Sequence, residues 1–289
     1  MTMAMDCVIT LAAPGPLDPF RVAAVTEAVG GTFVERLSDT AQDIYAAGDP
    51  RALRDAALTV LADDPVDVIA QPVASRAKKL LISDMDSTLI QQECIDELGA
   101  MVGKKAEIAA ITERAMAGEL DFAEALRARV ALLQGVPTSA VADLLADVIV
   151  DTPGAREVIA ACRAAGIRTV LVSGGFTAFA EPIRQRLGMD AAYSNILLTD
   201  GDVFSGAVAD PILGADAKRV RMNAECSALN ITASEVVAVG DGANDIPMIE
   251  GAGLGVGYRA KPKLAAAADA VLRHTDFSTV GYAMGLLRP

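Results

Sequence analysis

Cysteine and histidine are scarce in this sequence, and they are too dispersed to form a zinc site. The 289 residues include four cysteines and one histidine, and no two cysteines form a CxxC pair. This pattern excludes the usual zinc-binding spacings and is typical of reduced, buried thiols in a cytoplasmic protein. The cysteines are Cys7, Cys94, Cys162 and Cys226. We expect a structural role for His274, the only histidine, so a Ser-His-Asp triad is not predicted.

Long uncharged apolar runs and an excess of basic residues are also missing. No run of about 18 apolar residues without a charge occurs, so we expect no transmembrane helix. The first basic residue is Arg21 and the apolar stretch before it is short, which argues against a secretory signal and for a cytoplasmic location. The formal net charge of −13 argues against general nucleic-acid binding. A small anionic substrate would therefore need a local cation or a metal ion in order to bind.

Residues 5–75 form the first of two sequence patterns. Strand-like and helix-like segments follow one another in the order βαββαβ, and Asp49 and Pro50 suit the start of the second helix. This order predicts an α+β ferredoxin-like domain with the split βαβ arrangement. Residues 75–79 (SRAKK) form a polar joint, so we place the domain boundary after residue 76. The apolar share of 52 % is large enough for two hydrophobic cores.

The second pattern, at residues 77–289, is of the α/β kind. Three near-continuous apolar runs, at residues 79–83, 167–175 and 235–242, are typical of buried parallel strands, and each ends in Asp, Ser or Gly. With helices between them, they predict a Rossmann-like doubly wound parallel sheet. Residues 91–150 are interpreted as helices only, and that segment is too long for one crossover helix. We therefore expect an inserted helical cap there.

Two of these strand ends carry a pair of aspartates. Asp84 and Asp86 end the run LLISDMD, and Asp241 and Asp245 follow the run VAVG. Because ligands of doubly wound sheets bind at the carboxyl ends of the strands, we expect all four carboxylates in one cleft. Their mutual repulsion predicts a divalent cation, and an all-oxygen ligand set favours magnesium. One carboxylate of the first pair could attack a phosphorus or carbon centre while the other moves a proton.

Simpler interpretations of these aspartates stay open at this stage. Each pair could be part of a turn or a helix cap. A calcium-binding loop starting at Asp84 is excluded, because it requires glycine and glutamate where Leu89 and Ile95 stand. The segment GAMVGKK does not match the phosphate loop of nucleotide-binding proteins, because its glycines are too close together and Lys105 replaces Ser or Thr.

Two other positions are candidates for binding an anion. Ser173 ends the second apolar run and precedes Gly174 and Gly175, which we expect to open a helix whose free N–H groups suit a phosphate. Lys218 is predicted in the first turn of a helix, where a cation opposes the helix dipole by about 0.3–1 kcal/mol. An anion facing Lys218 would explain this position, and a solvated lysine is the alternative.

The predicted cap contains a helix with an arginine on its apolar face. Asp121 and Glu124 resemble a capping box at the start of this helix. Arg129 follows Phe122 by seven residues, so at about 100° per residue the two lie about 20° apart. Such an arginine is either paired in a buried salt bridge or available to clamp a substrate carboxylate. Glu93, at the entrance of the cap, is either an ordinary first-turn glutamate or a partner for a substrate ammonium.

Together these motifs resemble those of the haloacid dehalogenase-like phosphatase superfamily. DxDxT at Asp84, Ser173 with its glycines, Lys218 and GDGxND at Asp241 match in order and in place. The segments DMDSTLIQQECIDELG, LDFAEALRARVALL, VSGGF and VGDGANDIPMI are similar to those of phosphoserine phosphatases in particular. The similarity covers residues 78–289 and implies a magnesium-dependent enzyme that hydrolyses phosphoserine in the last step of serine biosynthesis.

The resemblance also implies a role for each matching residue. Asp84 would be the nucleophile that forms an aspartyl-phosphate, and Asp86 would protonate the leaving oxygen and then activate water. Lys218 would stabilise the transferring phosphoryl group. The implied magnesium ligands are the Asp84 carboxylate, the Asp86 backbone carbonyl and Asp241, with Asp245 in support. The implied substrate-binding residues are Glu93, Phe122, Arg129, Ser173, Gly174, Lys218 and Asn244.

The N-terminal domain, residues 1–76, resembles ACT-type regulatory domains in its βαββαβ order. Such domains can bind amino acids, often at dimer interfaces, which implies a homodimer formed through this domain. Its loop AAPGPLD is not a clear ligand-binding loop, so a role in assembly alone stays open. Two other functions also stay open: transfer of the phosphoryl group to another alcohol such as homoserine, and non-catalytic sensing of an amino acid.

Overall fold

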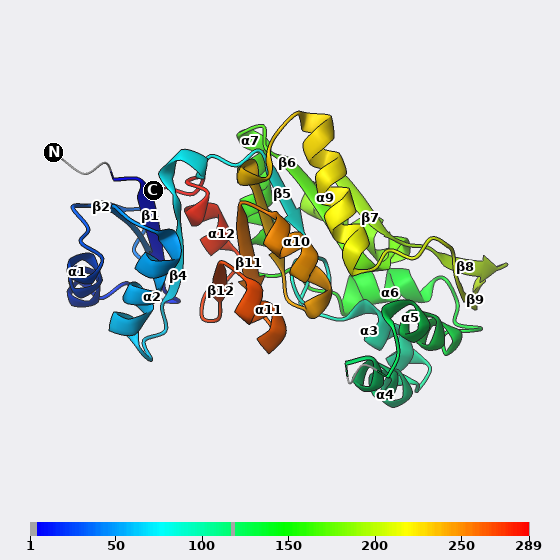
Figure 1. Cartoon of the computed structure of the whole chain (residues 1–289). Coiled ribbons are helices and arrows are strands. Elements are labelled where there is room, and N and C mark those ends of the chain that lie inside the picture. The colour runs from blue at the N-terminus through cyan, green and yellow to red at the C-terminus, as the bar shows by residue number, and fades with distance from the viewer. Residues whose placement is uncertain (1–4, 117–118, 289) are drawn as a thin grey trace.

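The computed structural model describes residues 5–116 and 119–288. Figure 1 shows three parts in a row: an N-terminal sheet with two helices, a central α/β core, and a group of helices at the far end beside a small hairpin. None of the helices in these two ranges is both long and apolar enough to cross a membrane. All four cysteines are free and buried, as predicted.

The N-terminal part has the predicted βαββαβ order. Its four antiparallel strands lie in the order β2-β3-β1-β4, which is the ferredoxin-like arrangement. As predicted, Asp49 caps the second helix, because its side chain accepts a hydrogen bond from the Ala52 N–H and Pro50 follows it. The elements are β1 (Cys7–Ala12), α1 (Pro19–Ala28), β2 (Phe33–Arg36), β3 (Ala41–Ala46), α2 (Pro50–Leu61) and β4 (Asp67–Pro72).

This N-terminal sheet is covered on both faces. Val68 and Ala70 of β4 pack with α1 and α2, whereas Ile69 belongs to the hydrophobic cluster of the central core. Gln71 continues the second face, since its side-chain amide donates to the Ala283 carbonyl 2.8 Å away. The alternation of side chains along a strand thus explains why β4 is buried almost throughout.

The joint between the two parts is packed rather than extended into solvent. Arg76 is 8 % exposed and its guanidinium lies 2.5 Å from the Asp43 carboxylate on β3. Arg76 also donates to the carbonyls of Tyr282 and Ala283. Lys78 is buried as well, and burial lowers the pKa of its ammonium to about 8. Arg76 and Lys78 of the predicted polar joint are therefore buried, whereas Ala77 and Lys79 are exposed.

The core is a six-stranded parallel sheet in the order β12-β11-β10-β5-β6-β7. Leu81 of β5 packs on one face with α7, α8 and α12, and Ile82 packs on the other with α9, α10 and α11. This is the doubly wound sheet that the sequence predicts. Its strands are β5 (Leu80–Ser83), β6 (Arg168–Phe176), β7 (Ala191–Asn195), β10 (Val236–Gly240), β11 (Leu254–Tyr258) and β12 (Ala270–Leu272). Its helices are α7 (Ala155–Ala164), α8 (Thr177–Leu187), α9 (Ala215–Leu229), α10 (Ile246–Gly251), α11 (Pro262–Ala267) and α12 (Ser278–Ala283).

The predicted helical cap follows β5. The capping box that Asp121 and Glu124 predict is present at the start of α5, with both reciprocal hydrogen bonds formed. The segments that enter and leave the cap are paired with each other by one isolated antiparallel bridge, between Ile90 and Asp151. Its helices are α3 (Cys94–Met101), α4 (Lys105–Met116), α5 (Phe122–Ala131) and α6 (Ala140–Asp147). Short 3₁₀ turns elsewhere are η1 (Val73–Ser75), η2 (Ala233–Glu235) and η3 (Ala243–Asp245).

One hairpin is absent from the sequence-based prediction. Strands β8 (Leu197–Asp200) and β9 (Val203–Val208) form a two-stranded sheet between β7 and α9. Gly201 and Asp202 form its two-residue turn, with φ 60° at Gly201, and a Gly-Asp pair between two strands is a typical hairpin signal. The hairpin contacts the cap, since the Gly135 N–H donates to the Phe204 carbonyl. The hairpin therefore lies beside the cap helices at the same end of the core (Figure 1).

Candidate active site

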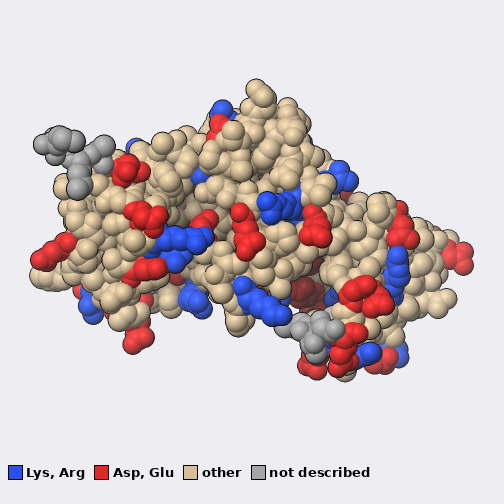
Figure 2. All heavy atoms as spheres, in the orientation of Figure 1, with Lys and Arg blue, Asp and Glu red and all other residues tan. Residues whose placement is uncertain are grey.

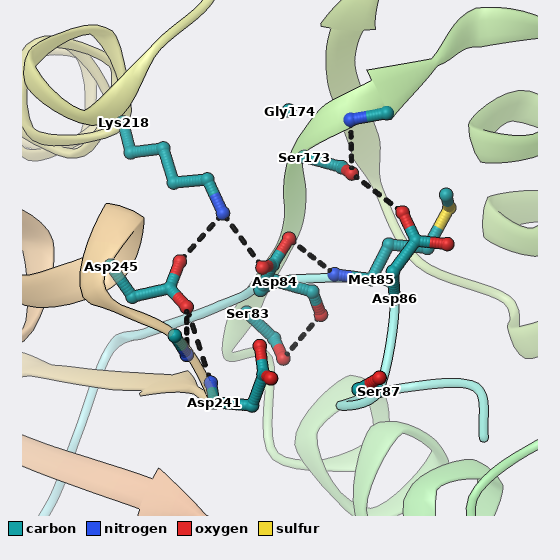
Figure 3. A network of polar contacts seen from close by, with 12 residues as sticks. Ser83, Asp84, Met85, Asp86, Ser87, Ser173, Gly174, Lys218, Asp241 and Asp245 are labelled. Atoms are coloured by element: carbon teal, nitrogen blue, oxygen red, sulfur yellow. Dashed lines mark hydrogen bonds and ion pairs between the residues drawn. The ribbon is translucent and has the colours of Figure 1, made fainter. Parts of the chain in front are cut away.

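The charged residues singled out in the sequence meet at one edge of the core sheet. Strand β5 lies between β6 and β10, and all three run parallel, so their carboxyl ends are adjacent. Asp84 follows β5, Ser173 lies near the end of β6 and Asp241 follows β10, and Figure 3 shows their side chains converging. On the face shown in Figure 2, acidic atoms lie deep in a hollow between the core and the cap.

Asp84 is held at the centre of this group. It is 4 % exposed, its Oδ1 accepts a 2.7 Å hydrogen bond from the Met85 N–H, and its Oδ2 lies 2.8 Å from Lys218 Nζ. Burial, followed by the neighbouring Asp245 charge, raises the pKa of Asp84 well above its usual value. The charged form of Asp84 thus depends on the cation beside it.

Lys218 supplies that cation. Its side chain is fully buried, and its ammonium lies between Asp84 and Asp245, 2.6 Å from the Asp245 Oδ1 (Figure 3). Burial acts to lower the pKa of Lys218, but the Asp245 and Asp84 charges outweigh it and hold the pKa above its usual value. The alternative of a solvated lysine is therefore excluded, and Lys218 stays positively charged near neutral pH.

Asp86 lies on the other side of Asp84 from Lys218 and makes different contacts. Its Oδ1 accepts a 2.9 Å hydrogen bond from the Cys94 N–H, and its Oδ2 accepts a 3.4 Å hydrogen bond from Ser173 Oγ. Burial raises the pKa of Asp86, and the hydrogen bonds with Cys94 oppose the rise. A carboxyl with a raised pKa next to a buried carboxylate is a suitable proton donor and acceptor.

The glycines after Ser173 do not open a helix, which corrects the prediction for this segment. Strand β6 continues to Phe176, which pairs with Asn195 of β7, and α8 begins only at Thr177. Because the glycines have no side chain, they allow other side chains to approach the strand closely instead. A Cβ atom at Gly175 would lie 2.7 Å from Asp86 Oδ2, and one at Gly174 would lie 3.0 Å from the Phe122 ring. Phosphate contacts here would come from Ser173 Oγ and the strand backbone.

Three carboxylates form a group that could hold a metal ion. Asp84, Asp241 and Asp245 offer oxygen atoms that all lie within 4.8 Å of one another, and all three residues are buried. Buried carboxylate oxygens without nitrogen or sulfur donors suit a hard divalent cation such as magnesium. The side chain of Asp86 is not part of this group. The residues at this edge therefore fit a divalent metal.

Asp245 differs from the other two carboxylates because both of its oxygens are engaged. Oδ1 pairs with Lys218, and Oδ2 accepts the N–H groups of Asp241 and Gly242 at 3.1 Å each. Asp245 thus shapes the loop that carries Asp241. Asn244 stands next to it in the turn η3, with its Oδ1 over Gly242, where a Cβ would lie 2.5 Å away. Its amide makes no direct contact with Asp84 or Ser173 among the described hydrogen bonds.

Glu93 lies where the cap begins, as the residue immediately before α3. Its Oε1 accepts a 2.7 Å hydrogen bond from Ser87 Oγ in the loop after Asp86. Burial, followed by the Asp86 charge, raises the pKa of Glu93 to about 7. Glu93 is therefore more than a surface glutamate of a first helical turn, because it is buried and the Asp86 charge acts on it.

Phe122 and Arg129 both lie on α5 of the cap, and Phe122 is the one of the two that contacts the core among the described contacts. The Phe122 ring packs against Gly174 and Gly214, where added Cβ atoms would lie 3.0 and 3.2 Å away. The cap thus stands closed against the core. Arg129 is partly buried and donates to the Ala125 carbonyl, and within residues 5–116 and 119–288 it forms no ion pair. The buried salt bridge that the sequence left open for Arg129 is not formed there.

Sequence reasoning missed two residues of the site. Lys261 lies 2.9 Å from Asp241 Oδ2, although it is twenty positions away and carries no motif. Asn195 is buried and bridges the Gly174 carbonyl and both backbone groups of Leu213, which ties β6 to the segment before α9. The only signal that the sequence offers for Asn195 is an asparagine at the end of a strand-like segment. Nothing in the sequence distinguishes Lys261.

Comparison with known proteins gives a consistent result. The family model described as haloacid dehalogenase-like hydrolase matches residues 81–250. A phosphoserine phosphatase of Albidiferax ferrireducens is 46 % identical over 197 residues, which cover 66 % of this chain and 83 % of that protein.

Two solved structures resemble almost the whole chain, including the N-terminal sheet. A HAD family hydrolase from Salmonella enterica serovar Typhi has a TM-score of 0.84 at 26 % identity, covering 96 % of this chain and 98 % of that one. A probable phosphoserine phosphatase from Vibrio cholerae, in its unliganded form, has a TM-score of 0.79 at 29 % identity, covering 98 % and 87 %.

Proposed function

The chain belongs to the haloacid dehalogenase-like hydrolase family, and from this premise we propose that it is a phosphatase that hydrolyses O-phospho-L-serine to L-serine and phosphate. The observation that carries the proposal is the buried group at the end of β5. There Asp84 lies 2.8 Å from the Lys218 ammonium, with the Asp86 carboxyl two residues on. A nucleophile, a cation and a proton carrier are what transfer of a phosphoryl group to a carboxylate requires.

In the first step, an Asp84 oxygen attacks phosphorus and the bond from phosphorus to the serine oxygen breaks. Asp86 gives its proton to that oxygen, which the raised pKa of its carboxyl favours. In the second step, Asp86 takes a proton from water, the water oxygen attacks phosphorus, and the bond to Asp84 breaks. Lys218, whose ammonium already touches Asp84, would stabilise charge on the phosphoryl oxygens in both steps.

A magnesium ion is part of the proposal. It would be held by the Asp84 carboxylate, the Asp86 backbone carbonyl and Asp241, with Asp245 fixing the loop that carries Asp241. When bound, it would reduce the repulsion between the Asp84 carboxylate and an incoming phosphate dianion. The donor set supports this choice because every available side-chain donor in the group is a carboxylate oxygen.

The amino-acid end of the substrate would bind to the cap. Arg129 has no carboxylate partner among the described residues, so its guanidinium is available for the carboxylate of phosphoserine. Glu93 would pair with the ammonium, and the Phe122 ring would close the pocket over Gly174. Ser173, Gly174 and Asn244 would contact the phosphate side. The closed cap would exclude bulk water during the first step.

The N-terminal unit is proposed as a separate regulatory or assembly domain covering residues 1–76, with the phosphatase domain at 77–289. A hydrophobic cluster of its own supports this division. Strand β2 is a sheet edge with Phe33 and Val34 exposed, so we propose that a second copy of the chain binds there. Phe33→Asp would then yield monomers in light scattering, and an unchanged mass would refute this dimer. The free, buried cysteines support a cytoplasmic location.

The test of the function is phosphate release from a panel of phosphomonoesters, with and without EDTA. We expect a strong preference for phosphoserine and loss of turnover in EDTA that magnesium restores. Turnover without metal, or no preference for phosphoserine, would contradict the proposal. Adding homoserine to the same assay distinguishes a phosphotransferase, which would produce a new phosphate ester instead of free phosphate. An amino-acid sensor would release no phosphate from any substrate.

A further inference from the structure

The two lysines of the site differ in how firmly they are held. Lys218 is fully buried between Asp84 and Asp245, so its ammonium cannot leave without depriving two buried carboxylates of their cation. The Lys261 side chain is 53 % exposed, and its ammonium lies 2.9 Å from Asp241 Oδ2. Lys261 can therefore exchange Asp241 for water at little cost.

The backbone keeps Lys261 next to Asp241 even when its side chain moves. Lys261 stands immediately before α11, and its N–H donates a 2.9 Å hydrogen bond to the Asp241 carbonyl. Among the described contacts, the Asp241 carboxylate has no other partner than the Lys261 ammonium. The ammonium thus neutralises the one carboxylate of the group that Lys218 does not reach.

We propose that Lys261 is a displaceable counter-ion of Asp241 that lowers the affinity of the site for its divalent cation. The inference rests on the proposed function, since it needs a metal at Asp84 and Asp241. A cation that binds Asp241 either moves the ammonium into solvent or binds while the positive charge stays close, and both weaken binding. Conversely, the ammonium stabilises the metal-free protein, in which the buried carboxylates would otherwise repel one another.

The Lys261 charge also acts weakly at the entrance of the cap, where it opposes the rise that burial and Asp86 cause in the pKa of Glu93. Among the described residues, the Lys261 ammonium contacts Asp241 and not Glu93. Lys261 is therefore a positioning residue, which acts through Asp241 and not on the phosphate.

The test is isothermal titration of the full chain with magnesium chloride in the absence of substrate. The Lys261→Gln variant lacks this half-exposed positive charge, so its Kd for magnesium should be about three- to fivefold lower than that of the original chain. Lys261→Arg keeps the charge and should stay within about twofold of the original chain. Lys263→Gln is the matched control. It removes an exposed lysine from the first turn of α11, two residues after Lys261, and this lysine forms no ion pair among the described residues, so Kd should not change.

A second readout is thermal unfolding with and without magnesium. Without metal, Lys261→Gln should unfold at a lower temperature than the original chain. Added magnesium should raise the unfolding temperature of the variant by more than that of the original chain. Equal or weaker magnesium binding by Lys261→Gln, or tighter binding by the Lys263→Gln control as well, would overturn the inference. Asp241→Asn separates the two proposals. If that variant binds magnesium normally, the metal site itself is wrong, whereas failure of Lys261→Gln alone refutes only the role of Lys261.

Discussion

Burial shifts the pKa of Glu93 upward and that of Arg129 downward. The sequence identified both residues as candidates but could not predict their burial or their contacts. Their positions in the motifs identified them as candidates, yet each also had an ordinary structural interpretation. The structure decides between these interpretations through contacts. Glu93 accepts a hydrogen bond from Ser87 and its pKa is raised by burial and by the Asp86 charge, and Arg129 forms no ion pair among the described residues. Such contacts depend on how the cap packs on the core, which local sequence patterns do not encode. Two predictions follow at this scale.

The pKa of Glu93, raised to about 7, predicts a pH-dependent substrate affinity. Above pH 7 the carboxylate is charged and can pair with the substrate ammonium, and as the pH falls through 7 it becomes neutral. KM for phosphoserine should therefore rise about tenfold from pH 8 to pH 6, relative to a phosphomonoester with a carboxylate but no ammonium. Because both substrates are phosphomonoesters, protonation of the phosphate affects both KM values alike and cancels in their ratio. Glu93→Gln should make the ratio independent of pH, and a slope that persists in this variant would contradict the assignment.

Arg129→Ala should affect recognition of the carboxylate only. We expect KM for phosphoserine to rise about a hundredfold, because a bidentate charge-assisted contact is lost. KM for a phosphomonoester without a carboxylate should change less than about threefold. The measurement is steady-state kinetics on both substrates, with Arg127→Ala, an exposed arginine on the same helix, as control. Equal effects on both substrates would make Arg129 a structural residue.

At the scale of elements, the sequence predicted those whose patterns are local. The three apolar runs, the βαββαβ unit and the capping box at Asp121 all follow from spacing within a single segment. The extension of β6 through Gly174 and Gly175 was mistaken for a helix start, because their close contacts with Asp86 and Phe122 come from distant parts of the chain. The hairpin of β8 and β9 was missed although its Gly-Asp turn at residues 201–202 is a usable signal.

Asn195 is the last residue of β7, just before that hairpin, and links β6 to the segment before α9. Replacing it measures how much these links contribute to binding of the phosphate. Asn195→Ala removes the bonds from β7 to the Gly174 carbonyl and to Leu213 and leaves buried backbone groups unpaired. We expect a loss of about 1–3 kcal/mol in the free energy of unfolding. KM should rise about equally for phosphoserine and for a simple aryl phosphate, because both share the phosphate. A rise confined to phosphoserine would place the effect in the cap instead.

At the scale of the whole molecule, the N-terminal unit and the cap lie at opposite ends of the core (Figure 1). The unit is fixed to the core through Arg76, which joins Asp43 of its sheet to the Ala283 carbonyl at the end of α12. The polar composition of residues 75–79 suggested a joint, but only the structure shows that Arg76 and Lys78 within it are buried. Any signal from this unit would therefore travel through the core sheet and not by direct contact with the site.

Arg76→Met tests how tightly the two parts are joined. It leaves the Asp43 carboxylate, which is fully buried, without its cation, so we expect a loss of about 3–5 kcal/mol in the free energy of unfolding. Adding Asp43→Asn should recover part of that loss, because the unpaired charge is removed. Denaturant unfolding of the two variants measures both effects. KM for phosphoserine should stay unchanged, and a large change in KM would mean that the unit acts on the site directly.

The central claim is that Asp84 receives the phosphoryl group, and covalent trapping tests it most directly. In Asp86→Asn, an aryl phosphate whose leaving group needs no proton should still phosphorylate Asp84, while the water-activating carboxylate is missing. Acid quenching followed by peptide mass spectrometry should then find one phosphoryl group on the peptide with Asp84. A burst of the aryl alcohol with Asp84 unmodified, or with the phosphoryl group on another residue, would contradict the account.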